Sequence, residues 1–145
     1  MKKVIFLDFD GVLNNYYNPL HARRCLSPIY IGNLNSLLSI VPDVKIVISS
    51  TWRIIRDLKQ LKDVLALAGF KHPHVVIDTT PRISGSQRGQ EIDQWLSDNK
   101  DVLSFVILDD DSDMDPHMDH LVKTNGYTGL TKNDVTQAAS ILSNA

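Results

Sequence analysis

Short apolar runs alternate with longer amphipathic stretches along the chain. Four of the runs are almost wholly apolar and stop at polar residues, which is typical of strands buried on both faces of a sheet. They cover residues 4–9, 45–49, 75–78 and 103–109. A shorter run at 121–124 predicts another strand near the C-terminus. Together the runs predict one mostly parallel sheet.

The stretches between the strands carry helix signals. Ser27 followed by Pro28 indicates a helix start, and apolar residues then recur at helical spacing until Pro42. A second helix is predicted over residues 54–67, ending before Gly69, a residue typical of helix C-terminal caps. The spacing places six apolar residues on its buried face: Ile54, Ile55, Leu58, Leu61, Leu65 and Leu67.

Two further helices are predicted in the second half of the chain. One covers residues 89–97, with Ile92, Trp95 and Leu96 facing inward. The other follows Thr131, which forms a capping-box pattern with Asp134. Its buried face is expected to consist of Val135, Ala138, Ala139 and Leu142.

The alternation of strand and helix predicts a doubly wound α/β fold, a three-layer sandwich around a mostly parallel central sheet. The length of 145 residues suits one domain, so we expect residues 1–145 to form a single unit. In such sheets ligands bind beyond the carboxyl ends of the strands. The polar residues that end the apolar runs are therefore the candidates for function: Asp8, Asp10, Ser49, Ser50, Asp78, Asp109 and Asp110.

The composition of the chain indicates no particular function, but it argues against some classes of protein. Hydrophobic residues make up 43% of the chain and charged residues 22%, which is ordinary for a folded globular protein and argues against disorder. Fifteen basic and 17 acidic residues give a formal net charge of −2. No overall basic field therefore indicates a nucleic-acid or membrane partner.

The single cysteine and the N-terminus bear on localisation. Cys25 excludes an intramolecular disulfide and a cysteine-based zinc site, and it fits a reducing cytoplasm. No run of residues is long and apolar enough for a membrane span. Asp8 and Asp10 interrupt the N-terminal apolar run, so we expect no signal peptide and a mature chain that begins at Met1.

Carboxylates gather at two predicted strand ends. Strand alternation directs Asp8 and Asp10 to the same side, where their mutual repulsion is costly unless a cation or a shared proton compensates it. Asp109 and Asp110, at the end of another strand, would converge on the same edge of the sheet. A hard divalent cation is the simplest compensation, and Mg²⁺ suits a few carboxylates together with a substrate phosphate.

Four segments in order resemble the motifs of haloacid dehalogenase (HAD) superfamily phosphatases. Residues 6–13, Phe-Leu-Asp-Phe-Asp-Gly-Val-Leu, resemble the first motif, and residues 46–49 resemble the second, an apolar strand ending in serine. Arg88 resembles the basic residue of the third motif, and residues 106–110 resemble the acidic fourth. The resemblance covers nearly the whole chain. Three segments also resemble a small HAD subgroup associated with RNA-repair proteins: residues 49–53, 88–92 and 129–131.

The resemblance implies roles for the acidic residues. Asp8 would be the nucleophile that forms an aspartyl phosphate, and Asp10 would act as general acid and then general base. Mg²⁺ would be held by the Asp8 carboxylate, the Asp10 backbone carbonyl and Asp110. Asp109 is expected to support these ligands without being one of them. Asp111, Asp113 and Asp115 stay open as further supports of the metal or of Arg88.

The resemblance also implies how a phosphoryl group would be bound. Ser49, with the backbone N–H of Ser50, would hold a phosphoryl oxygen, and Arg88 would balance the remaining charge. Arginine stands at a position where lysine is commoner in the family, which changes reach and hydrogen-bond geometry but keeps the charge.

Other conspicuous residues have structural interpretations. Arg53 either contacts substrate or forms an ion pair with Asp57, four residues further on. Trp52 and Trp95 are interpreted as packing residues rather than base-stacking platforms. The histidines of Asp115-Pro116-His117-Met118-Asp119-His120 match no familiar zinc motif and are assigned to a polar loop, and His72-Pro73-His74 is assigned to a turn.

The spacing of the motifs limits the substrate. The intervals 11–43 and 53–87 have no room for the folded cap that many HAD enzymes insert there, so the resemblance implies an open site. An open site favours a bulky phosphorylated substrate, such as a nucleic-acid end or a phosphoprotein. A small nucleotide or sugar phosphate is the alternative substrate. No motif indicates an obligate protein partner.

Two other functions compete with a phosphatase. A non-catalytic module could bind Mg²⁺ or phosphate, but it would have little need for Asp10 beside Ser49 and Arg88. A receiver domain would place its phosphorylated aspartate after a middle strand and a lysine after a later one, and this chain has neither order.

Overall fold

The strands of the computed structural model, which describes residues 1–17 and 25–144, form one five-stranded parallel sheet. The order across the sheet is β3-β2-β1-β4-β5, so β1 is central and lies between β2 and β4. This arrangement confirms the predicted α/β class. The strands are β1 Lys2–Leu7, β2 Val44–Ile48, β3 Val76–Thr79, β4 Val102–Asp109 and β5 Leu121–Lys123.

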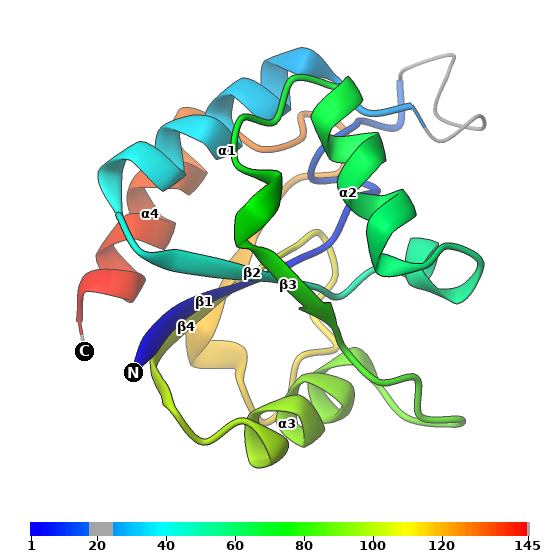
Figure 1. The fold of residues 1–145 in the computed structure, drawn as a ribbon, viewed down its shortest axis with the longest axis vertical. Coiled ribbons are helices and arrows are strands. Elements are labelled where there is room, and N and C mark those ends of the chain that lie inside the picture. The colour runs from blue at the N-terminus through cyan, green and yellow to red at the C-terminus, as the bar shows by residue number, and fades with distance from the viewer. Residues whose placement is uncertain (18–24, 145) are drawn as a thin grey trace.

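Helices cover both faces of the sheet. In Figure 1, α1, α2 and α4 lie on one face and α3 lies alone on the other. The α-helices are α1 Pro28–Ile40, α2 Leu58–Leu67, α3 Arg88–Asp98 and α4 Lys132–Ser143. Three short 3₁₀ turns complete the described elements: η2 Thr51–Ile54, η3 Pro73–Val75 and η4 Met118–His120.

The alternation of side chains along β1 divides the core into two clusters. Ile5 and Leu7 belong to the larger cluster, which includes the buried residues of α1, α2 and α4. Val4 and Phe6 face the opposite way and pack with Trp95 of α3, whose ring meets that of Phe6 edge-on at a centroid distance of 5.5 Å. A strand buried on both faces has to be apolar at consecutive positions, which explains the uninterrupted run.

The second helix begins later than the apolar spacing predicts. Residues 51–54 form η2, and Asp57 caps α2 by accepting a hydrogen bond from Gln60 N at 2.8 Å. Ile54 and Ile55, predicted to be buried, are 46% and 72% exposed, and Leu67 is 89% exposed. The prediction was wrong at these positions: the capping box starts α2 only after Ile54 and Ile55, and Leu67 is the exposed last residue of the helix.

The connections hold no folded cap among the described residues. Between residues 25 and 43 the chain forms α1, and between 53 and 87 it forms α2, η3, β3 and loops. In the part of the chain that the structure describes, the connections that leave the carboxyl end of the sheet therefore contain no inserted domain. Among residues 1–17 and 25–144, no helix combines the length and apolarity needed to cross a bilayer.

Candidate active site

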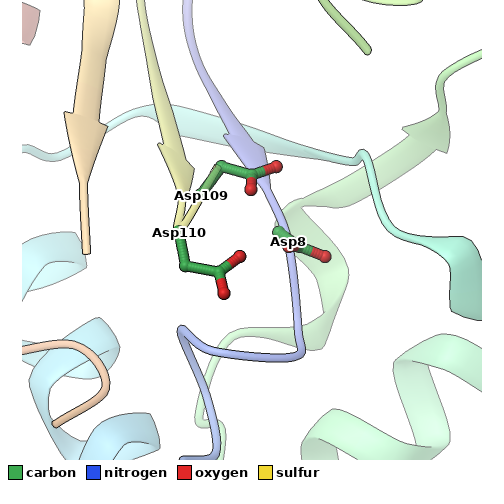
Figure 2. A group of neighbouring side chains, drawn as sticks. All are labelled: Asp8, Asp109 and Asp110. Atoms are coloured by element: carbon green, nitrogen blue, oxygen red, sulfur yellow. The ribbon is translucent and has the colours of Figure 1, made fainter. Parts of the chain in front are cut away.

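Three carboxyl groups meet where β1 and β4 end. The two strands pair in register at Leu7 and Leu108, and Asp8 N donates to the Leu108 carbonyl at 3.0 Å. Asp8, Asp109 and Asp110 each offer a carboxylate oxygen within 4.8 Å of the others (Figure 2). Asp8 and Asp109 are buried, and Asp110 is half-buried. This group of oxygens could hold a metal ion.

Burial makes these carboxylates hard to ionise together. Burial raises the pKa of Asp8 well above its usual range, the charge of Asp109 raises it further, and Arg88 opposes both effects. Burial raises the pKa of Asp109 to about 6, again with Arg88 acting in the opposite direction. Burial also raises the pKa of Asp110. A bound cation would lower all three pKa values by favouring the ionised forms.

Arg88 stands between the two buried carboxylates. Its Nη1 lies 3.6 Å from Asp8 Oδ1 and 3.6 Å from Asp109 Oδ2, and it donates a hydrogen bond to the Ser49 carbonyl. Arg88 thus supplies positive charge to both carboxylates from the first residue of α3.

Asp113 holds the helix start that carries Arg88. Its Oδ2 accepts from Arg88 N at 3.4 Å, and its carbonyl accepts from Gly89 N at 2.9 Å. Of the three acidic residues left open by the sequence, Asp113 is therefore the one that orients α3. Asp111 is exposed beside the pocket and donates its N–H to Asp109 Oδ1 at 3.0 Å, while the side chain of Asp115 is exposed.

Ser49 adjoins this charge cluster through its backbone carbonyl, and its hydroxyl is buried. Among the described residues its Oγ has no hydrogen-bond partner, although Ser49 is 1% exposed. A buried hydroxyl without a partner is costly, so Ser49 Oγ has unused hydrogen-bonding capacity. The neighbouring Ser50 is also buried, but its Oγ caps η2 by accepting from Trp52 N at 3.3 Å.

Two donors fix the side chain of Asp10. Asn14 Nδ2 donates to Asp10 Oδ1 at 2.9 Å, and Trp52 Nε1 donates to Asp10 Oδ2 at 3.1 Å. The turn depends on Gly11, whose φ is +80° and whose added Cβ would overlap the Asp110 carboxylate. The sequence predicted packing for Trp52, and its ring does pack edge-on against Phe9. Its N–H also donates to the Asp10 carboxylate.

A pocket of about 190 Å³ lies at the carboxyl ends of β1 and β4. The predicted residues that it brings together are Asp8, Asp10, Arg88, Asp109 and Asp110. Ser49 and Ser50 are not among the lining residues, and Ser49 adjoins the site through its contact with Arg88. The sequence reasoning missed Tyr16, which also lines the pocket and donates a hydrogen bond to Asp110.

Arg53 forms an ion pair with Glu91 rather than with Asp57. Its Nη2 lies 2.8 Å from Glu91 Oε1 in a pair that is almost fully buried. Its Nε donates to the Thr80 carbonyl at 3.0 Å, and its Nη1 donates to the Ser50 carbonyl at 2.8 Å. Burial lowers the pKa of Arg53, and the charge of Glu91 opposes that effect.

The remaining histidines and Trp95 have structural contacts. Trp95 is buried against the sheet and donates to Asp78 Oδ2 at 2.7 Å. His117 pairs with Asp93 at 2.9 Å, and the ring of His120 stacks on Phe105 at 3.8 Å. Neither histidine joins a metal-binding group among the described residues. Pro73 begins η3, in keeping with the predicted turn.

Comparison with known proteins identifies a family. The family model described as "HAD domain in Swiss Army Knife RNA repair proteins" matches residues 4–135. The match includes every strand end that contributes to the pocket. Neither the curated proteins nor the solved structures contain a significant match.

Proposed function

The chain belongs to the family of HAD domains found in Swiss Army Knife RNA repair proteins, and we propose that it is a Mg²⁺-dependent phosphomonoesterase that uses Asp8 as its nucleophile. The observation that carries this proposal is the surroundings of Asp8. The buried Asp8 carboxylate lies 3.6 Å from Arg88 Nη1, and Arg88 also donates to the carbonyl of Ser49, whose buried hydroxyl has no partner among the described residues. These are the groups that a phosphoryl-transfer site needs.

The donor set fits Mg²⁺. All the candidate ligands are oxygens, which hard divalent cations prefer. Burial raises the pKa values of Asp8 and Asp109, and a bound cation would favour their ionised forms. Asp8 and Asp110 would hold the ion together with the Asp10 carbonyl. Asp109 would support them, because its oxygens already engage Arg88 and Asp111 N. When bound, Mg²⁺ supplies charge neutralisation that lets an anionic nucleophile approach a phosphate.

The first step would transfer the phosphoryl group to the protein. An Asp8 oxygen attacks phosphorus, the bond between phosphorus and the ester oxygen breaks, and Asp10 donates a proton to the departing alkoxide. Arg88, the Ser49 hydroxyl and the Ser50 N–H would bind the non-bridging oxygens. Asn14 and Trp52 keep Asp10 aimed, since both donate to its carboxylate.

The second step would release inorganic phosphate. Asp10, now ionised, takes a proton from a water molecule, and the water oxygen attacks phosphorus. The bond between phosphorus and Asp8 breaks, so the carboxylate is restored and Asp10 is protonated again. The absence of a folded cap among the described residues favours a bulky substrate such as a polynucleotide end or a phosphoprotein over a small nucleotide or sugar phosphate.

Phosphate release tests this proposal. Purified protein should hydrolyse at least one of three esters in Mg²⁺: para-nitrophenyl phosphate, a 3′-phosphorylated oligonucleotide or a phosphopeptide. The activity should disappear in EDTA, return with Mg²⁺, and fall about 1,000-fold or more in Asp8→Asn. Asp63→Asn is the matched control, because Asp63 is an exposed carboxylate on α2.

Two results would contradict the proposal. Turnover that survives Asp8→Asn undiminished would exclude Asp8 as nucleophile. Binding of Mg²⁺ and of beryllium fluoride at Asp8, without hydrolysis of any of the three esters, would instead identify a non-catalytic binding module.

A further inference from the structure

A second and larger hollow adjoins the catalytic pocket. Its volume is about 590 Å³, within the range of about 300–1,000 Å³ usual for ligand sites. Tyr16, Asp110 and Asp111 line both hollows, so a group bound in the larger one would lie next to a phosphate held at Asp8. Its other walls are Lys123, Thr124, Asn125, Gly126 and Tyr127.

Two of the four tyrosines in the chain, Tyr16 and Tyr127, line this hollow, and Tyr17 packs against Tyr127. The ring centroid of Tyr127 lies 5.4 Å from that of Tyr16 and 4.9 Å from that of Tyr17. The three side chains are 45% (Tyr16), 76% (Tyr17) and 54% (Tyr127) exposed, so the hydrophobic core does not account for them. Clustered exposed aromatic rings are typical of a surface that binds a partner.

The turn that presents Tyr127 is held by several hydrogen bonds. Tyr127 N donates to Asn125 Oδ1 at 2.9 Å, and Gly129 N donates to the Asn125 carbonyl at 2.8 Å. Tyr16 N donates to the Gly126 carbonyl at 2.9 Å, and an added Cβ at Gly126 would overlap the Tyr16 ring. The aromatic wall is therefore built in place before a ligand arrives, which lowers the cost of binding.

The charges of the hollow suit a single nucleotide better than a long polyanion. Among residues 1–17 and 25–144, Lys123 is the one cation that lines it, against Asp110 and Asp111. Tracking a nucleic-acid backbone requires a basic groove, whereas stacking on a base requires only an accessible aromatic face. Tyr127 lines the hollow and is half-exposed, so its ring can offer such a face.

We propose that this hollow binds the nucleobase of the nucleotide whose phosphate is cleaved at Asp8, with the base against Tyr127. The inference rests on the proposed phosphatase function and narrows its substrate to a nucleobase-bearing phosphate ester. A free nucleotide and the terminal nucleotide of a nucleic acid present the same chemistry to the hollow.

Binding and turnover with matched oligonucleotides test the inference. One labelled oligonucleotide carries a base and a 3′-phosphate on its last residue, and a second is identical except that this residue is abasic. Fluorescence anisotropy on Asp8→Asn protein gives Kd without turnover, and wild-type protein gives kcat/KM. Removal of the base should weaken both by about 5- to 150-fold, the range expected for stacking of one base.

Substitutions localise the effect. In Tyr127→Ala the two oligonucleotides should have nearly equal Kd and nearly equal kcat/KM. Tyr127→Phe keeps the ring, so it should preserve the wild-type difference between them. Leu67→Ala, at an exposed position on α2, should leave both values as in the wild type. Since Tyr127 is half-exposed, its truncation should leave the thermal unfolding midpoint nearly unchanged.

The outcomes separate this inference from the phosphatase proposal. Base-dependent binding that Tyr127→Ala abolishes supports the hollow even if no ester is hydrolysed. Turnover with no preference for the base, a preference that survives Tyr127→Ala, or a phosphopeptide hydrolysed faster than either oligonucleotide would overturn it. A mononucleotide that binds as well as the oligonucleotide points to free nucleotides as the source, and one that binds tenfold more weakly points to nucleic-acid ends.

Discussion

The buried ion pair between Arg53 and Glu91 should be the most sensitive contact behind the site. Its nitrogen and oxygen lie 2.8 Å apart, and the side chains are 6% and 9% exposed. Glu91 Oε2 also accepts from Ile83 N at 2.9 Å, and Arg53 donates to the Ser50 and Thr80 carbonyls. One ion pair thus joins η2, the loop before α3, and α3 itself.

The cost of breaking this pair follows from burial. Arg53→Met removes one charge and leaves Glu91 buried without its counter-charge, which costs about 3–5 kcal/mol. For a chain of this length we expect the unfolding midpoint to fall by about 10 °C or more. Arg53→Met combined with Glu91→Leu should cost less than Arg53→Met alone, because neither charge then remains buried and unpaired.

Thermal and urea unfolding of four proteins would measure these costs. They are the wild type, the single variant, the double variant and Lys59→Met as a matched control. Lys59 pairs with Asp63 at 3.0 Å, but both side chains are exposed, so this substitution should leave the midpoint nearly unchanged. A loss in Arg53→Met no larger than in Lys59→Met would refute the reasoning. A double variant less stable than Arg53→Met would refute the account based on an unpaired charge.

Two further predictions concern the carboxylates. Because burial raises the pKa of Asp8, and that of Asp109 to about 6, the folded protein binds protons more tightly than the unfolded chain. In EDTA the free energy of unfolding of the wild type, relative to that of Asp109→Asn, should therefore fall as pH rises from about 4 to about 6. Urea titrations at several pH values would measure this difference, and a difference that grows as pH rises would contradict the prediction. Gly11→Ala should weaken Mg²⁺ binding and activity more than Gly85→Ala, because both have positive φ (80° and 76°) but only Gly11 faces the Asp110 carboxylate. Equal effects of the two substitutions in Mg²⁺ titrations would exclude the steric explanation.

The sequence predicted the sheet better than the helix boundaries. Strands buried on both faces leave an unmistakable run, and residues 4–7 are completely buried as expected. The start of α2 could not be obtained from apolar spacing, because Asp57 and Gln60 form a local capping box that starts the helix only after Ile54 and Ile55. Local hydrogen bonds decided the boundary against the hydrophobic pattern.

The candidate site was predictable where it depends on strand ends. Asp8, Asp109 and Asp110 directly follow or end strands that a parallel sheet places side by side, so their meeting follows from topology. The partner of Arg53 was not predictable, since Glu91 lies 38 residues away and nothing in the local sequence indicates it. The tyrosine cluster was not predictable for the same reason, because Tyr16 and Tyr127 are distant in the sequence and come into contact only in the folded chain.

The order of the strands explains why so much unfavourable charge collects at one edge. β1 pairs with β4 on one side and with β2 on the other, so Asp8 stands between Asp109 and the Ser49 carbonyl that binds Arg88. Two buried acids with raised pKa values weaken the fold unless a cation joins them. Asp113 accepts a hydrogen bond from Arg88 N, and the Arg53–Glu91 ion pair joins η2 to α3, so these contacts hold the arginine that offsets the acidic charge. A metal ion bound to the same carboxylates would offset that charge further and favour their ionised forms.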